Sequence, residues 1–197
     1  MNYLKTLVKI LLIGQCFLLC VCDTKKEKAA VVTPEQQELN LTDFVKCPFN
    51  EEFNDKTNLE KYVLKKFGKP DKLKKWRGPL DKTAGANIIT DEIEIGYSAK
   101  YAFGIQRGVS KKFEVFETIA IKNPTNVDLK YGINEETTMR DIKNLFGEPL
   151  EAKEGSYYYR YSSYNSGGAY VYHLHIYFEN GKLYYLEIKI NIVSGRL

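Results

Sequence analysis

The sequence predicts an α+β fold in which each of two similar halves places a short helix against a three-stranded antiparallel sheet. Two observations predict this fold: a helix pattern that occurs twice and ends each time in Phe-Gly-x-Pro, and runs of strand-forming residues after each helix. Hydrophobic residues make up 44% of the 197 residues and charged residues 27%, which is sufficient for an ordinary core. The formal charge of +4 is too small to indicate nucleic-acid binding by itself.

The first 22 residues have the pattern of an export signal. Lys5 and Lys9 precede an uncharged apolar run that ends at Cys22. This run is shorter than the roughly 20 residues that a spanning helix needs. We therefore expect residues 1–22 to be a signal peptide, and a retained N-terminal anchor is the alternative.

Two processing routes fit this segment. It is similar to a bacterial lipoprotein signal, in which a cysteine after a short apolar run is lipidated and becomes the first mature residue; Cys20 and Cys22 are best placed for this, although neither follows a small residue. The alternative is ordinary secretion with a cut before Asp23. We expect lipidation, and hence a lipid-anchored location in the bacterial cell envelope.

Cys47 is the one cysteine beyond residue 22, so a framework of several disulfides is excluded. We expect Cys47 to behave as a buried small apolar residue. Residues 23–42 are polar and charged, with one proline and no aromatic residue, which is typical of a flexible tether. The two α+β halves are then expected over residues 43–122 and 123–197.

The helix of each half has start and stop signals. In the first half, Thr57 is the expected cap, with Glu60 three residues later, and in the second half Thr138 and Asp141 occupy the same places. Glycine and proline follow each helix and end it.

Three strands are expected after each helix. They cover residues 87–97, 99–109 and 113–121 in the first half, and 156–164, 170–179 and 182–190 in the second. The Asn180-Gly181 pair predicts a tight hairpin, because both residues tolerate the positive φ of a type I′ turn. The last strands of the halves also correspond, since residues 115–119 resemble residues 185–189.

These motifs resemble a known family. The segment YGINEETTMRDIKNLFGEP (131–149), the Tyr-rich strands and the segment YFENGKL (177–183) together resemble the small outer-membrane assembly lipoproteins of the SmpA/OmlA (BamE) type. They are also similar to the beta-lactamase inhibitor protein (BLIP) superfamily. The resemblance covers residues 130–190, and more loosely 55–121. It implies tandem BLIP-like repeats and a non-catalytic role in envelope assembly or inhibition.

Tyrosine is concentrated in the strands of the second half. It offers a large rigid area and a hydroxyl group that remains hydrated, which suits recognition surfaces. We therefore predict a protein-binding sheet face formed by Tyr170, Tyr172, His173, His175, Tyr177 and Tyr185. The alternative interpretation is that aromatic residues are there because they favour strands.

The histidine pair supports a second functional hypothesis. Alternation along a strand places His173 and His175 on one face, and two imidazoles can ligate zinc if the fold supplies a third ligand such as Cys47 or Glu187. The chain would then be a secreted metal-dependent hydrolase. Because no nucleophile elbow, phosphate loop or paired-cysteine site is present, we expect no catalytic residue, no metal and no cofactor.

Residues 61–77 form a basic segment. It contains eight lysine and arginine residues and one acidic residue, Asp71. We expect a solvated helix end and loop; contact with anionic lipid or an acidic partner is the alternative. The expected partners are therefore an unidentified protein and the membrane through the lipid anchor. Nucleic acid is not expected, because export removes the chain from the cytoplasm.

Overall fold

The computed structural model describes residues 32–53, 57–77, 91–98, 100–107, 114–165 and 168–193. The chain from Val32 to Leu197 forms one compact unit. The expected signal peptide, with Cys20 and Cys22, and the tether up to residue 31 lie outside the described residues.

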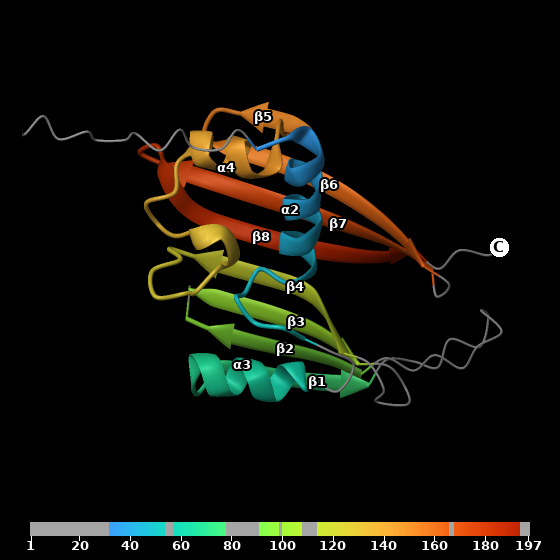
Figure 1. The fold of residues 1–197 in the computed structure, drawn as a ribbon. Helices are drawn as coiled ribbons and strands as arrows, with labels where there is room; N and C mark the ends of the chain where they lie inside the picture. The colour runs from blue at the N-terminus through green and yellow to red at the C-terminus, as the bar shows by residue number, and fades with distance from the viewer. Residues whose placement is uncertain are drawn as a thin grey trace, which may run out of the picture. The chain divides into compact units, whose positions relative to one another are not determined.

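The described elements form one antiparallel sheet with helices on one side (Figure 1). The helices are α2 (Pro34–Lys46), α3 (Leu59–Phe67) and α4 (Met139–Phe146), with a 3₁₀ turn η1 (Lys130–Gly132). The strands are β1 (Lys72–Arg77), β2 (Asp91–Tyr97), β3 (Tyr101–Arg107), β4 (Glu114–Lys122), β5 (Glu151–Lys153), β6 (Ser156–Asn165), β7 (Gly168–Glu179) and β8 (Lys182–Val193). The predicted α+β class is confirmed.

The strand order is β1-β2-β3-β4-β8-β7-β6-β5. A helix followed by four strands therefore occurs twice along the chain, as α3 with β1 to β4 and as α4 with β5 to β8. The last strands of the two halves, β4 and β8, pair at the centre, where Ile119 is opposite Ile188 and Ile121 is opposite Leu186. The two segments that resemble each other in sequence are thus neighbours in the sheet.

The prediction of three strands in each half was wrong, because each half also contributes an edge strand, β1 or β5. β1 has the sequence KLKKWR and β5 has only three residues, all exposed. An edge strand that is exposed and charged carries no clear apolar alternation. The basic segment is accordingly helix α3 followed by strand β1, where a helix end and loop were expected.

Helix α4 has the start that its sequence predicts. The Thr138 hydroxyl accepts from the Asp141 backbone N–H, and the Asp141 carboxylate accepts from the Thr138 N–H at 2.9 Å. The helix ends at Gly147, with φ +79°. In α3 the cap is one residue later than predicted, because the Asn58 side chain, not that of Thr57, accepts from the Lys61 N–H at 2.8 Å.

The prediction of a flexible tether over residues 23–42 is wrong from Pro34 onward, where helix α2 begins. Thr33 caps α2 and Pro34 occupies the first turn, and the helix then buries Leu41, Phe44 and Val45 against the rest of the unit. The apolar spacing of these three residues indicates a helix, but two of them lie beyond residue 42. Residues 34–39, which are mostly polar, therefore form the largely exposed first turns of a docked helix, whereas Asn40 is buried.

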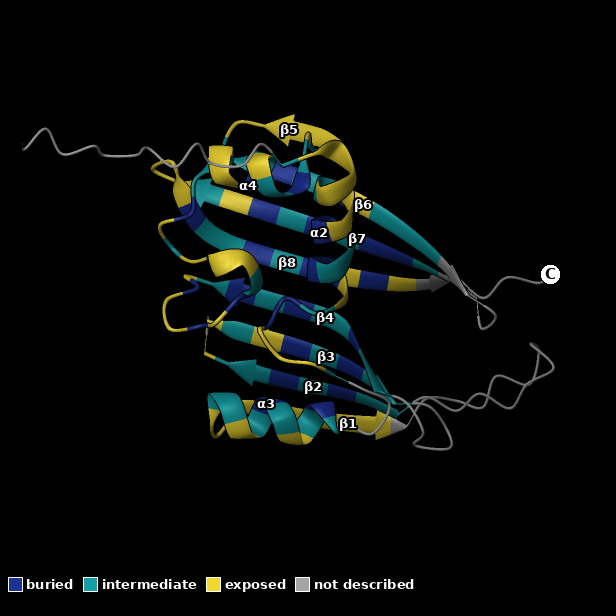
Figure 2. Cartoon of the chain, viewed as in Figure 1, coloured by how far each residue is buried: buried dark blue, intermediate teal, exposed yellow. Residues whose placement is uncertain are grey.

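The core lies between the helices and the sheet, and buried positions alternate with more exposed ones along the strands (Figure 2). Phe44 of α2 packs on Phe146 of α4, with ring centroids 5.2 Å apart. Strand residues of the opposite alternation point away from the helices. We call this the open face, because none of the described helices packs on it.

Candidate protein-binding surface

Strand β7 divides its side chains between the two sides of the sheet. Leu174 and Ile176 are buried in the core, whereas His173, His175 and Tyr177 lie on the open face. Tyr177 is 42% exposed. Alternation along the strand places these three residues together, as expected from the sequence.

Tyr170 and Tyr172 do not share this face, which corrects the predicted surface. Both belong to the alternation that faces the helices: Tyr172 is 9% exposed within the core, and Tyr170 packs against that core. The ring of Tyr172 lies 6.0 Å from the ring of Tyr161 on β6. The same alternation that groups the histidines excludes these two tyrosines.

Neighbouring strands complete the open-face cluster. Tyr185 of β8 is directly opposite Tyr177, with ring centroids 5.5 Å apart. Tyr158 of β6 is opposite His175, with ring centroids 4.7 Å apart, and was missed in the sequence because its strand register was unknown. We call the set Tyr158, His173, His175, Tyr177 and Tyr185 the Tyr/His surface.

A shallow hollow of about 470 Å³ lies at one end of the Tyr/His surface. Its lining includes Tyr158, His175 and Tyr177, together with Glu151 and Lys153 of the edge strand β5. The hollow therefore combines aromatic rings with charged side chains of an edge strand, and protein interfaces likewise combine an aromatic core with a polar rim.

Hydrogen bonds hold His173 in one orientation. The Asn191 side-chain amide donates to Nε2 at 3.1 Å, so the neutral ring carries its proton on Nδ1 and donates it to the Tyr158 hydroxyl oxygen at 2.7 Å. Burial lowers the pKa of His173, and the positive charges of Arg160, His175 and Lys189 lower it further. The folded protein thus favours the neutral imidazole.

This pKa shift predicts a pH dependence of folding. Because the pKa of His173 is lower in the folded chain than in the unfolded chain, its contribution is fully present above the unfolded pKa of about 6.5 and is lost as the pH falls toward the folded pKa. We expect urea unfolding to show a greater loss of stability between pH 7.5 and pH 5 for the wild type than for His173→Gln. An identical loss in both proteins would contradict this assignment.

The zinc hypothesis needs a third ligand beside the histidines. Glu187 is directly opposite His175, but its carboxylate forms an ion pair with Lys189 at 3.0 Å. Cys47 follows α2 on the helix side, where its thiol donates to the Phe49 carbonyl oxygen at 3.6 Å and where burial raises its pKa. In the described ranges no three His, Cys, Asp or Glu side chains are grouped closely enough to hold a metal ion.

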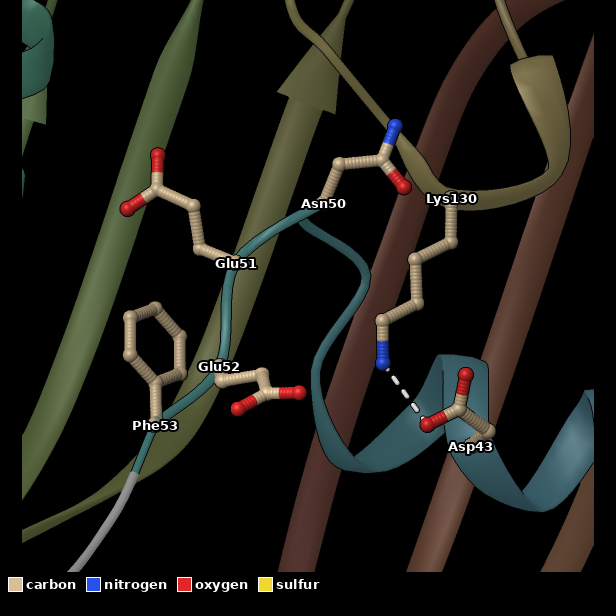
Figure 3. A pocket seen from close by; sticks show the side chains of 6 residues that line it. All are labelled: Asp43, Asn50, Glu51, Glu52, Phe53 and Lys130. Carbon is tan, nitrogen blue, oxygen red and sulfur yellow. Dashed lines mark hydrogen bonds and ion pairs between the residues drawn. The ribbon is translucent and has the colours of Figure 1, made fainter.

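A polar hollow of about 490 Å³ lies on the helix side, between α2 and η1 (Figure 3). At its edge Lys130 pairs with Asp43 at 2.7 Å, and the Tyr131 hydroxyl donates to the same carboxylate at 2.8 Å. These contacts hold α2 against the connection between the halves. We interpret the hollow as structural.

At least three of the seven basic residues of α3 and β1 form ion pairs with described carboxylates. Lys66 contacts Glu51 at 2.8 Å, Lys72 contacts Glu94 at 2.7 Å, and Lys75 contacts Glu60 at 2.5 Å. The excess positive charge of α3 and β1 is therefore partly offset by the carboxylates of Glu51, Glu60 and Glu94. This leaves less free charge for an anionic membrane surface than the sequence suggests.

No helix in the described part of the chain has the length and apolar character needed to cross a membrane. Comparisons with protein-family models, with curated proteins and with solved structures found no match.

Proposed function

We propose that this protein is a non-catalytic protein-binding module of the bacterial cell envelope. A lipid on Cys20 or Cys22 anchors it to the membrane, and a protein partner binds the open face of the sheet. The observation that carries the proposal is the Tyr/His surface, a group of aromatic rings on a sheet face that none of the described helices covers.

The contacts within this surface support a binding role. The ring of Tyr158 lies beside both histidines and is hydrogen-bonded to one of them, and the rings of Tyr177 and Tyr185 pack on each other. These contacts order the side chains before a partner arrives. An ordered aromatic surface loses little conformational entropy on binding, so more of the contact energy remains available for affinity.

The order of elements supports the BLIP-like arrangement as part of this proposal. Each unit of one helix and four strands contributes half of the sheet, and the two units meet through β4 and β8. Two such units form a wide face with a single continuous surface. Recognition of a folded protein, in envelope assembly or inhibition, is the role that this architecture suits.

The anchor is tested on the protein produced in its native host. Mass spectrometry of the mature N-terminus is expected to find a diacylglyceryl-modified cysteine at position 20 or 22. A mature chain that begins at Asp23 without lipid would contradict the anchor and leave a secreted module.

The surface is tested with the triple variant Tyr158→Ala, His175→Ala and Tyr177→Ala. These side chains lie outside the core, so we expect cooperative unfolding with a thermal midpoint lowered only by the lost cross-strand contacts, and loss of the chemical cross-link to the partner in cells. The matched control replaces two exposed residues away from the surface, Leu39 and Leu150, with alanine and is expected to retain the cross-link. Equal cross-linking by the triple variant and the wild type would contradict the proposed surface.

A further inference from the structure

A second feature of the open face lies in the first half of the sheet, where β2 and β3 form the floor of a groove. Its volume is about 430 Å³. The floor is formed by Gly96, Ala102 and Gly104, in which Gly96 is opposite Ala102 across the two strands. Small residues on adjacent strands leave space that larger side chains would fill.

One wall of the groove is aromatic. Trp76 of β1 is 40% exposed and is directly opposite Glu92 of β2. Its indole N–H donates to the Glu92 carboxylate, which fixes the ring at the groove. An exposed indole beside a carboxylate can bind a cation through its ring face and through charge together.

The charges of the groove are unbalanced. Its lining contains Lys72 and three glutamates, which gives a net formal charge of −2, and Lys72 already pairs with Glu94 at 2.7 Å. No ion pair is formed by Glu92 or Glu117 among the described residues, although Glu92 accepts from the Trp76 indole and Glu117 from the Gln106 side chain. Lys74, which is opposite Glu94 and on the same face of β1 as Trp76, lies beside the groove but is not part of its lining. Burial raises the pKa of Glu117, and the nearby carboxylate of Glu92 raises it further.

We propose that this groove binds a lysine or arginine side chain from an extended segment of the partner protein. The aliphatic part of the side chain lies over the floor of Gly96, Ala102 and Gly104, and its cationic group lies between Trp76 and the carboxylates of Glu92 and Glu117. The inference rests on the proposed function, because it takes the cation to be carried by a protein.

Charge complementarity selects this occupant. Two nearby carboxylates without a cation repel each other, and a bound ammonium or guanidinium group relieves this repulsion. An anionic lipid headgroup or an acidic peptide would be repelled by the same charges. A bare divalent ion would not use the indole ring or the apolar floor, so it fits fewer features of the groove.

Trp76 allows a direct binding measurement, because it is the only tryptophan in the chain. Its fluorescence would be followed while the full mature protein is titrated with a capped Gly-Ser-Arg-Ser-Gly peptide. The control peptide replaces arginine with citrulline, which has a similar shape but no charge. We expect a saturable fluorescence change with the arginine peptide that weakens with added salt, and at least about fivefold weaker binding of the citrulline peptide.

Two carboxylate variants and a filling variant test the position of the cation. Glu92→Gln and Glu117→Gln are each expected to weaken binding of the arginine peptide by about three- to fivefold. Ala102→Leu is expected to abolish binding because it fills the groove from an exposed position. Glu38→Gln, which removes a carboxylate from the exposed side of α2, is the charge-matched control and is expected to bind normally.

Each alternative outcome is distinguishable. Equal binding of the arginine and citrulline peptides, no binding of either, or full binding by both glutamine variants would overturn the cation site. Stronger binding of Ca²⁺ than of the peptide would identify a metal site and would overturn it too. None of these outcomes affects cross-linking at the Tyr/His surface, so failure of the groove and failure of the proposed function are separate results.

Discussion

Replacing Phe49 with alanine is expected to lower the free energy of unfolding by about 4 kcal/mol, the usual range for losing a fully buried phenylalanine. Its side chain is 0% exposed, and its ring lies 5.8 to 6.3 Å from the rings of Tyr62, Phe67, Phe103 and Phe116. Phe49 thus joins the segment after α2 to α3, β3 and β4, and no single neighbour can fill the cavity that alanine would leave.

Urea unfolding of the wild type and of Phe49→Ala measures this difference. The control is Leu39→Ala on the outer side of α2, where leucine is 59% exposed and the expected change is within about 0.5 kcal/mol. A loss as small at Phe49 as at Leu39 would contradict the packing around the Phe49 ring.

The second large effect is expected at Glu114, the first residue of β4. Its carboxylate accepts from Arg107 Nε at 2.7 Å and from the Leu59 backbone N–H, at the start of α3, at 2.6 Å. Arg107 also contacts Glu60 of α3 at 3.3 Å. The Glu114 and Arg107 side chains are only 7% and 15% exposed, so water cannot readily replace either partner.

We expect Glu114→Ala to lower the free energy of unfolding by about 3 kcal/mol, because it removes the acceptor of Nε of the largely buried Arg107 and the acceptor of the Leu59 N–H at the start of α3. Arg107→Met combined with Glu114→Ala should cost less than the sum of the single changes, since the pair is then removed together. Glu148→Gln, which breaks the exposed ion pair with Lys143, is the control and should change stability by less than about 1 kcal/mol. Additive losses at Arg107 and Glu114 would contradict a coupled pair.

Local signals in the sequence predict part of this fold well. The capping residues Thr138 and Asp141 define the start of α4, and Asn180 and Gly181, with φ of 53° and 79°, define the hairpin between β7 and β8. Each of these features depends on residues close together in the chain. Such short-range chemistry is visible without the tertiary structure.

Elements whose stability depends on distant contacts are harder to predict. Strand β1 exists because it pairs with β2, with Lys75 opposite Ile93 and Trp76 opposite Glu92, although its own sequence is rich in lysine. Helix α2 is stabilised by docking, which includes a hydrogen bond from the Asn40 side chain to the Leu145 carbonyl oxygen at 3.2 Å. Composition alone indicates solvated chain in both cases.

The candidate surface likewise depends partly on local patterns and partly on contacts between distant residues. Alternation within β7 groups His173, His175 and Tyr177 and, applied strictly, excludes Tyr172. The contribution of Tyr158 depends on the register between β6 and β7, which no local pattern contains. The groove beside Trp76 likewise depends on the register of four strands, β1 to β4.

The most direct test of binding through the open face is photo-cross-linking in the native host. A photoreactive amino acid would be placed at Tyr177 on the open face and, in a second protein, at Leu39 on the helix side, both of which are exposed. Our account predicts one discrete protein adduct from position 177 and none from position 39. Adducts from position 39 alone, or the same adducts from both positions, would contradict it.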